Sequence, residues 1–226
     1  MGENVKITSG DGFVFDAYRA EPEGTPNASI LLIQEIFGIN NHIRSVADDY
    51  ASKGYLVLAP AIFDRYAPGI ELDYDSDGVS KGADIAFNKL NMSETLADLA
   101  ATVNALAVTG RVGAVGYCFG GLLAFLSANQ VSGLACSIGY YGGGIAGVVD
   151  KKPKLPLMLH FGALDSHIPL SDVELIQSAL PEVTVNVFAD AEHGFNCDQR
   201  ASYNAEAARA ALDQSLAFFA QHLLSN

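Results

Sequence analysis

A cysteine flanked by glycines is the residue best placed to act as a nucleophile. Cys118 lies in the run Gly116-Tyr-Cys-Phe-Gly120, where an apolar stretch typical of a strand turns abruptly into a predicted helix. At such a turn the nucleophile adopts a strained backbone conformation, so the residues two positions before and after it must lack side chains. The N-terminus of the helix offers free N–H groups to a thiolate and to an oxyanion. The pattern predicts nucleophilic attack by Cys118, with the amide of Phe119 as one oxyanion donor.

An acid and then a histidine follow Cys118, each after a later strand, which is the chain order of the fold that carries a nucleophile on a strand-to-helix turn of this kind. Asp165 comes just after the apolar run Pro156–Gly162, and His193 comes just after Thr184–Phe188. A histidine oriented by a carboxylate can hold a cysteine as a thiolate or convert it to one. Neighbouring residues could compete for the two roles: Asp190, Glu192, His160 and His167. His160 falls inside a strand and is expected to be a packed core residue, and two further histidines, His42 and His222, are expected to be ordinary helix residues.

The segment Gln34-Glu-Ile-Phe-Gly38 places an acid in apolar surroundings directly after a buried strand. The loop in this position donates the second oxyanion N–H, which points to the amide of Ile36. Glu35 has two interpretations. Its carboxylate is satisfied by local hydrogen bonds or a nearby arginine, or it faces Cys118 and keeps the thiol protonated until a substrate arrives. Phe37 and Tyr141 are expected to line the pocket because of their loop positions.

Apolar runs of strand length alternate with segments of helical periodicity, a pattern typical of an α/β chain with a mostly parallel sheet. Asp11-Gly12 predicts a tight turn that opens the chain with a hairpin, Val5–Ser9 and Phe13–Arg19. The other predicted strands are Ser29–Ile33, Tyr55–Ala59, Val112–Tyr117, Ala135–Tyr140, Pro156–Gly162 and Thr184–Phe188. The predicted helices are Ile43–Lys53, Asn91–Val108, Phe119–Asn129, Ser171–Leu180 and Ser202–Leu224. Asp64–Gly82 and Gly142–Pro153 do not fit the alternation and are candidate rims of a pocket. Since no linker divides the chain, we expect one domain over residues 1–226.

Composition narrows the range of partners. The chain has 13 Lys and Arg against 26 Asp and Glu, a formal net charge of −13, and no basic stripe, which argues against nucleic acid and anionic membranes. The first twenty residues do not resemble a signal peptide and no apolar run approaches the length of a membrane span, so a cytoplasmic protein is expected. Three scattered cysteines without a C-x-x-C pair predict neither a disulfide framework nor a zinc site. We expect a small-molecule substrate, no cofactor, no metal, and a monomer or weak homodimer.

Four motifs together resemble the dienelactone hydrolase family, also called carboxymethylenebutenolidases. They are QEIFGIN at Gln34–Asn40, GYCFGG at Gly116–Gly121, G-x-x-D at Gly162–Asp165 and AEHGF at Ala191–Phe195. The resemblance covers essentially the whole chain. It implies an α/β-hydrolase fold, a mostly parallel central sheet flanked by helices without a separate lid domain. It also implies a Cys118–His193–Asp165 triad, with Glu35 as an auxiliary carboxylate contacting the thiol, that acts on lactones or activated esters through a thioester.

The chain departs from the family pattern at the residues that hold the substrate's carboxylate. Where the muconate-lactone enzyme of the family has arginines and a tyrosine, this chain has Ser80, Asp84 and Cys197. The carboxylate clamp is therefore expected to be missing. Lys81 and Arg200 lie close in sequence to these positions and have two interpretations: they compensate for the missing clamp, or they are solvated surface charges, which is the expectation favoured here.

Two alternatives to hydrolysis stay open. The spacing Asp73-x-Asp75-x-Asp77-Gly78, followed by Asp84 as twelfth ligand, fits a calcium loop. Pro68 and Gly69 stand where an entering helix should run, which argues against it. The second alternative is a small-molecule binding protein that keeps the pocket without turnover, and the complete set of nucleophile, histidine and acid argues against that.

Overall fold

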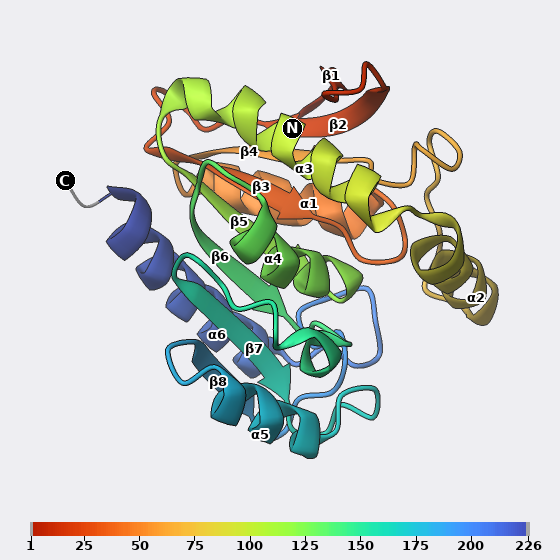
Figure 1. Cartoon of the computed structure of the whole chain (residues 1–226), viewed down its shortest axis with the longest axis vertical. Helices are drawn as coiled ribbons and strands as arrows, with labels where there is room; N and C mark the ends of the chain where they lie inside the picture. The colour runs from red at the N-terminus through yellow and green to blue at the C-terminus, as the bar shows by residue number, and fades with distance from the viewer. Residues whose placement is uncertain (1, 225–226) are drawn as a thin grey trace.

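One eight-stranded sheet organises the chain, as described by a computed structural model for residues 2–224 (Figure 1). The strands are β1 (Glu3–Thr8), β2 (Val14–Ala20), β3 (Ala28–Ile33), β4 (Tyr55–Pro60), β5 (Val112–Tyr117), β6 (Leu134–Tyr140), β7 (Leu157–Gly162) and β8 (Thr184–Phe188). Their spatial order is β1-β2-β4-β3-β5-β6-β7-β8. The two strands of the predicted hairpin, β1 and β2, pair antiparallel with each other, and β2 also pairs antiparallel with β4. Every other neighbouring pair is parallel. The predicted α/β architecture is confirmed.

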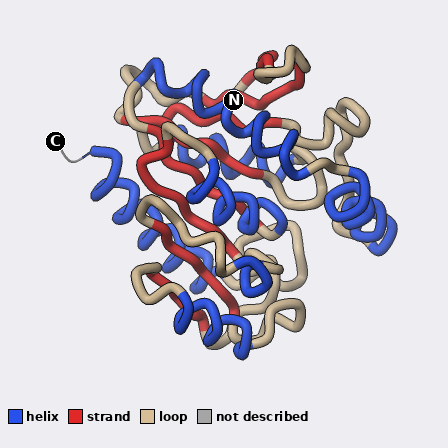
Figure 2. Tube along the Cα trace, viewed as in Figure 1, coloured by secondary structure: helices blue, strands red, loops and turns tan. Residues whose placement is uncertain are grey.

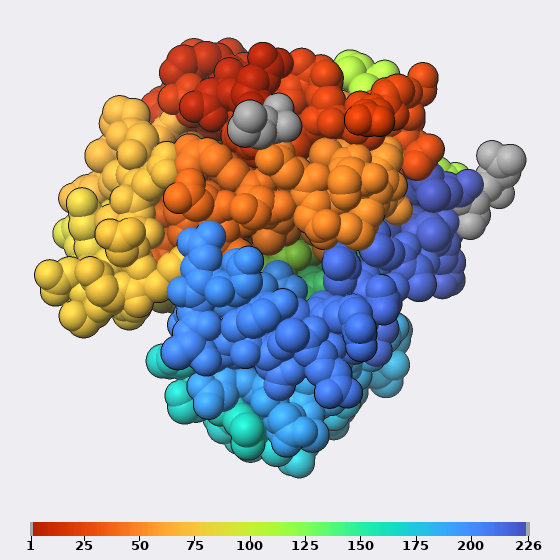
Figure 3. All heavy atoms as spheres, turned by 180° about the vertical axis from the view of Figure 1, so that it is seen from behind, coloured from red at the N-terminus to blue at the C-terminus, as the bar shows by residue number. Residues whose placement is uncertain are grey.

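Helices cover both faces of the sheet, which explains why every residue of β3, β4 and β5 is buried. α3 (Met92–Leu106), α4 (Phe119–Gln130) and α5 (Leu170–Ala179) lie on the face toward the viewer in Figure 1. α1 (Asn41–Ser52, orange) and α6 (Ala205–Phe219, blue) cover the opposite face, which Figure 3 shows from behind. Short turns of other helix types complete the set: η2 (Ala107–Thr109), η3 (Ile145–Val148) and η4 (Ala220–Leu224). No helix among residues 2–224 has the length and apolar character to cross a bilayer.

The parallel register brings the carboxyl ends of the central strands to one edge of the sheet. Ile33 at the end of β3 pairs with Gly116 near the end of β5. Gly162 at the end of β7 pairs with Phe188 at the end of β8. The loops that follow these four strands therefore meet at the same place, where α/β sheets bind their ligands.

One predicted irregular segment contains a helix. α2 (Ser76–Asp84), continued by the single π-turn η1 (Ile85–Lys89), begins within the range 64–82 and projects from the body of the molecule (Figure 2). The Asp75 side chain caps it by accepting a hydrogen bond of 2.7 Å from the Gly78 amide. Gly82 packs against the chain: a Cβ there would lie 2.1 Å from the Ile36 carbonyl oxygen. α2 therefore packs against the loop that follows β3.

This helix is incompatible with the calcium loop. A calcium loop wraps its acids around one ion, whereas Asp77 and Asp84 lie along α2 and are exposed. Asp75 is the helix cap, and the Asp84 carboxylate lies 3.7 Å from the Lys89 ammonium. The four aspartates therefore do not converge, and the calcium alternative is wrong.

Candidate active site

The turn between β5 and α4 holds Cys118 in a conformation that side chains rarely adopt. Its φ is +55° and its ψ is −116°. A Cβ on Gly116 would lie 1.9 Å from the Gly120 carbonyl oxygen, and one on Gly120 would lie 2.4 Å from the Ile33 carbonyl oxygen. Glycine is therefore required at both positions because backbone approaches backbone there. The predicted strand, sharp turn and helix around the cysteine are confirmed.

The structure brings together the cysteine, the histidine and the acid that the sequence selects. His193 Nε2 lies 3.2 Å from Cys118 Sγ, and His193 Nδ1 lies 2.7 Å from Asp165 Oδ2. The other oxygen of Asp165 accepts hydrogen bonds from the amides of His167 at 2.8 Å and Ile168 at 3.2 Å. The carboxylate is therefore held in place, and it orients the imidazole toward the sulfur.

His193 is held in the imidazolium form. Burial disfavours its charge, but the hydrogen bonds to Asp165 and Cys118, together with the charges of these two groups, outweigh burial and raise the pKa of His193 to about 10. An imidazolium with one proton on each nitrogen can donate to Asp165 and to Cys118 at the same time.

This raised pKa predicts a pH-dependent contribution to stability. With an ordinary pKa of 6.5 in the unfolded chain and about 10 in the folded one, His193 binds a proton on folding between these two values. Its stabilising contribution is fully present below pH 6.5 and is lost as the pH rises through about 10. We expect urea unfolding to give a larger difference in stability between the wild type and His193→Gln near pH 6 than near pH 10.5. A difference that stays constant over this range would contradict the assignment, since other titrating groups are common to both proteins.

The two backbone amides predicted to hold an oxyanion belong to residues that lie beside Cys118. Ile36 and Phe119 both line the cavity that contains Cys118. Phe119 is the first residue of α4, so its N–H has no partner within the helix. Within residues 2–224, neither amide donates a hydrogen bond to a protein atom. Both amides therefore keep a free donor in the cavity that contains Cys118.

The cavity at Cys118 is small and mostly apolar. Its volume is about 380 Å³, and it is lined by Ile36, Phe37, Val79, Ala83, Phe87, Cys118, Phe119, Leu122, Gly143, Gly144, His167, His193 and Arg200. Both irregular segments contribute to the rim, through Val79 and Gly143 among others. Phe37 lines the cavity as predicted, and the exposed ring of Phe87 packs edge-on against Phe119 at 5.4 Å.

Tyr141 was expected to line the cavity, but it does not. Its φ of +37° and the hydrogen bond from its amide to the His160 carbonyl at 2.7 Å turn the side chain inward. The ring is fully buried and packs edge-on against the His193 imidazole, with centroids 5.2 Å apart. Tyr141 therefore supports the imidazole from behind and does not contact the cavity.

The Glu35 carboxylate faces Tyr74 and Arg200, as in the first of its two interpretations, but only one of its two oxygens, Oε2, accepts a hydrogen bond. The Tyr74 hydroxyl donates to Oε2 at 2.8 Å, and Arg200 Nη1 lies 3.7 Å from Oε1. Burial and the charge of Glu35 raise the pKa of Tyr74, so the phenol stays a donor. Among the residues that the structure describes, no hydrogen bond joins Glu35 to Cys118, the thiol that the resemblance assigns to it as a partner.

Arg200 is not a solvated surface charge. It lines the cavity, and its guanidinium carbon lies 5.6 Å from the centre of the Tyr74 ring. Lys81, by contrast, is exposed on α2, as are Ser80 and Asp84. The pairing of Arg200 with Glu35 crosses 165 positions, so no spacing in the sequence could have indicated it.

Sequence reasoning also missed the environment of His42 and Cys197. His42 is not an ordinary helix residue: its side chain is buried beneath α1. Cys197 is buried too, and this burial, followed by the charge of Glu35, raises the pKa of its thiol to about 11. The sequence held no signal that these two residues lie close to Glu35, because the three side chains come from three separate segments.

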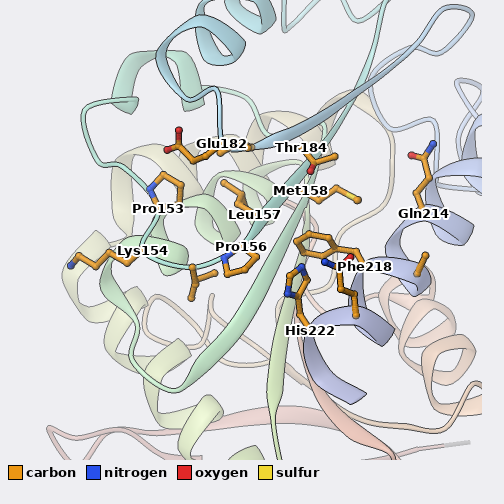
Figure 4. A pocket seen from close by; sticks show the side chains of 14 residues that line it. Pro153, Lys154, Pro156, Leu157, Met158, Glu182, Thr184, Gln214, Phe218 and His222 are labelled. Carbon is orange, nitrogen blue, oxygen red and sulfur yellow. The ribbon is translucent and has the colours of Figure 1, made fainter. Parts of the chain in front are cut away.

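The other histidines lie away from this site. His160 is a packed residue of β7, as predicted: burial lowers its pKa to about 3, and its Nε2 lies 3.1 Å from the Ser215 hydroxyl. His222 and Phe218 border a separate cavity of about 750 Å³, which Figure 4 shows beside Pro156, Met158 and Thr184. This cavity lies at the amino ends of β7 and β8, and its lining includes none of Cys118, Asp165 and His193.

Comparison with known proteins agrees with this geometry. The model of the dienelactone hydrolase family matches residues 15–223. The carboxymethylenebutenolidase of Pseudomonas putida is 32% identical over 229 residues, covering 97% of each chain. A Synechocystis protein provisionally given the same name is 38% identical over 212 residues, 84% of this chain and 85% of its own. A Klebsiella pneumoniae structure, provisionally named a dienelactone hydrolase, has a TM-score of 0.84 at 29% identity and covers 98% of this chain and 99% of its own. The chain therefore belongs to the dienelactone hydrolase family and is a carboxylic ester hydrolase of the α/β-hydrolase fold.

Proposed function

We propose that this enzyme hydrolyses lactones or activated esters through a thioester on Cys118. The observation that carries the proposal is the continuous contact from Asp165 through His193 to Cys118 Sγ, at 2.7 and 3.2 Å, next to two unpaired amides. Each part has a role that acyl transfer needs: a nucleophile, an oriented acid–base group and an oxyanion site.

The reaction begins with the Cys118 thiolate paired with the His193 imidazolium. The sulfur attacks the carbonyl carbon, a C–S bond forms, and the N–H groups of Ile36 and Phe119 hold the oxyanion. When the tetrahedral intermediate collapses, the C–O bond to the leaving group breaks and that oxygen takes the proton from His193 Nε2. Neutral His193 then removes a proton from water, the water oxygen attacks the thioester, and the thiolate leaves. Because thiolates are good leaving groups, this route suits esters whose leaving oxygen is stabilised, such as enols, and not amides.

The cavity favours compact substrates with an apolar body. Arg200 is the only Lys or Arg among the lining residues that the structure describes, and Glu35 already opposes its charge. A substrate carboxylate would have to draw the guanidinium away from Glu35 and leave a buried carboxylate without its cation, which is costly. Neutral lactones and esters are therefore favoured, and Glu35 acts as a positioning residue that sets where Arg200 lies.

Trapping the acyl-enzyme tests the proposal. We expect intact mass spectrometry of the enzyme mixed with p-nitrophenyl acetate to show one acetyl group, located on the Cys118 peptide. Asp165→Asn should accumulate more of this adduct, because an asparagine no longer stabilises the imidazolium or its tautomer, and should turn over about 10²–10⁴-fold more slowly. Cys136→Ala, which removes a thiol buried in β6, is the matched control and should behave as wild type. Turnover with the acetyl group on another residue, or with none on Cys118 in either protein, would overturn the proposal.

A further inference from the structure

Behind the catalytic cavity, three potential metal ligands from distant segments meet in the interior. Glu35 follows β3, His42 lies in the first turn of α1, and Cys197 lies in the loop after β8. A carboxylate oxygen, a ring nitrogen and the sulfur all lie within 4.8 Å of one another. Bonds of about 2.0–2.3 Å to one ion would place tetrahedral donors about 3.3–3.8 Å apart, so a small contraction brings these atoms into position.

Two of these side chains have a buried polar atom without a hydrogen-bond partner. Glu35 and His42 are 0% and 2% exposed, and within residues 2–224 neither Glu35 Oε1 nor His42 Nε2 has a hydrogen-bond partner. Their other atoms face polar groups: Tyr74 donates to Glu35 Oε2 at 2.8 Å, and the Asp198 carboxylate lies 3.6 Å from His42 Nδ1, within reach of a hydrogen bond after a small shift. Partners of this kind orient the ligands of metal sites. An ion bonded to both buried atoms would relieve the cost of leaving them unpaired.

The geometry points to a binding site for one divalent cation of the zinc class, held by Glu35, His42 and Cys197. A mixed set of oxygen, nitrogen and sulfur donors suits Zn²⁺, whereas Ca²⁺ and Mg²⁺ take oxygen ligands. Binding forms three metal–ligand bonds and releases the Cys197 thiol proton to solvent. One carboxylate and one thiolate then balance the two charges of the ion, and a fourth position stays available for water.

A cleft leads from solvent to the outer side of His42. It has a volume of about 370 Å³, lies between α1 and the segment that precedes and begins α6, and includes His42, Asn196, Asp198 and Tyr203 in its lining. Figure 3 shows this hollow between the orange and blue parts of the surface. Cys118 and His193 belong to the catalytic cavity and not to this cleft, so the ion has a route that does not pass through the triad.

Arg200 competes with the ion for Glu35. Its Nη1 lies 3.7 Å from Glu35 Oε1, where the cation would bind. Two positive groups cannot share this oxygen without repulsion, so removing the guanidinium strengthens metal binding. Asp198→Asn has the opposite effect, because it weakens the group that orients His42. Substitutions of Arg200 and Asp198 are therefore expected to change the metal affinity in opposite directions.

Cobalt provides a probe that reports the sulfur ligand directly. We expect chelator-treated enzyme to bind one Co²⁺ per chain with a thiolate charge-transfer band in the near ultraviolet, and one equivalent of Zn²⁺ to abolish the band. Cys197→Ser should remove the band, and His42→Gln should weaken binding by about 100-fold or more. Asp198→Asn should weaken it by about 10–100-fold and Arg200→Gln should strengthen it. The matched controls, Cys118→Ser and Cys136→Ser, each remove a different thiol and should keep the band.

Three results would overturn the site. They are the absence of a thiolate band, its loss in Cys118→Ser, which would place the ion on the catalytic pair, or equal affinity in the wild type, Asp198→Asn and Arg200→Gln. Thermal unfolding in chelator shows which variants fold. If His42→Gln or Cys197→Ser does not, the opposite shifts expected for Asp198 and Arg200 still decide the question, because these side chains are 65% and 21% exposed. The titration requires no hydrolysis, so its outcome is independent of the triad's activity.

Discussion

Cys118→Ala is expected to lose ester and lactone hydrolysis by about 10⁴-fold or more, because it removes the only atom that can form the acyl-enzyme. The cavity, His193 and both oxyanion amides stay in place, so the variant should still bind substrate. The measurement is kcat/KM with p-nitrophenyl acetate, together with binding of a slowly hydrolysed lactone by calorimetry. Full turnover by the alanine variant would refute the cysteine mechanism.

Cys118→Ser separates the role of sulfur from that of the site. A serine hydroxyl must give up its proton during attack, whereas the raised pKa of His193 favours the imidazolium, which cannot accept one. We expect a weak esterase with activity between those of the wild type and the alanine variant. Iodoacetamide should inactivate the wild type and leave this residual activity unchanged.

Gly120→Ala is expected to damage both stability and catalysis. A Cβ at this position would lie 2.4 Å from the Ile33 carbonyl oxygen and 2.5 Å from the Gln34 carbonyl oxygen. Since both atoms belong to the backbone, the clash is relieved only by moving α4 away from the end of β3. We expect a loss of about 2–4 kcal/mol in unfolding free energy and a fall of about 5–10 °C in the unfolding midpoint.

Catalysis should fall further than stability alone explains. The same displacement moves the amides of Ile36 and Phe119 relative to Cys118, so kcat should fall at temperatures where the variant is fully folded. Gly147→Ala is the matched control: it lies in η3, and a Cβ there would meet nothing within 4 Å. Equal unfolding midpoints and equal kcat for the two variants would show that the close approach at Gly120 has no functional consequence.

Local requirements made the positions of the candidate catalytic residues predictable. The glycines around Cys118 are dictated by atoms within a few residues or on the adjoining strand, and Asp165 and His193 directly follow strands of clear apolar character. Parallel pairing then brings these loops together without any further information. Element boundaries also agree within a few residues, because caps such as Asn91, whose side chain accepts from the amides of Ser93 and Glu94, are local signals.

Features that depend on tertiary contacts could not be predicted. α2 contains Gly78 and Gly82, which disfavour helices in isolation, and its position depends on the contact between Gly82 and the Ile36 carbonyl. Tyr141 follows β6 as expected, but its positive φ sends the ring under His193. His42 looks like a surface residue until the loop that contains Cys197 covers it.

The contact between Gly82 and the Ile36 carbonyl has a consequence for how this enzyme can acquire new substrates. α2 supplies part of the cavity wall and also rests on the peptide that would hold the oxyanion. Changes that enlarge the cavity by moving the helix therefore alter rate and specificity together. Divergence toward new substrates is expected to concentrate at Val79, Ala83 and Phe87. Substitutions of these side chains change the shape of the wall while α2 stays in contact with the Ile36 carbonyl.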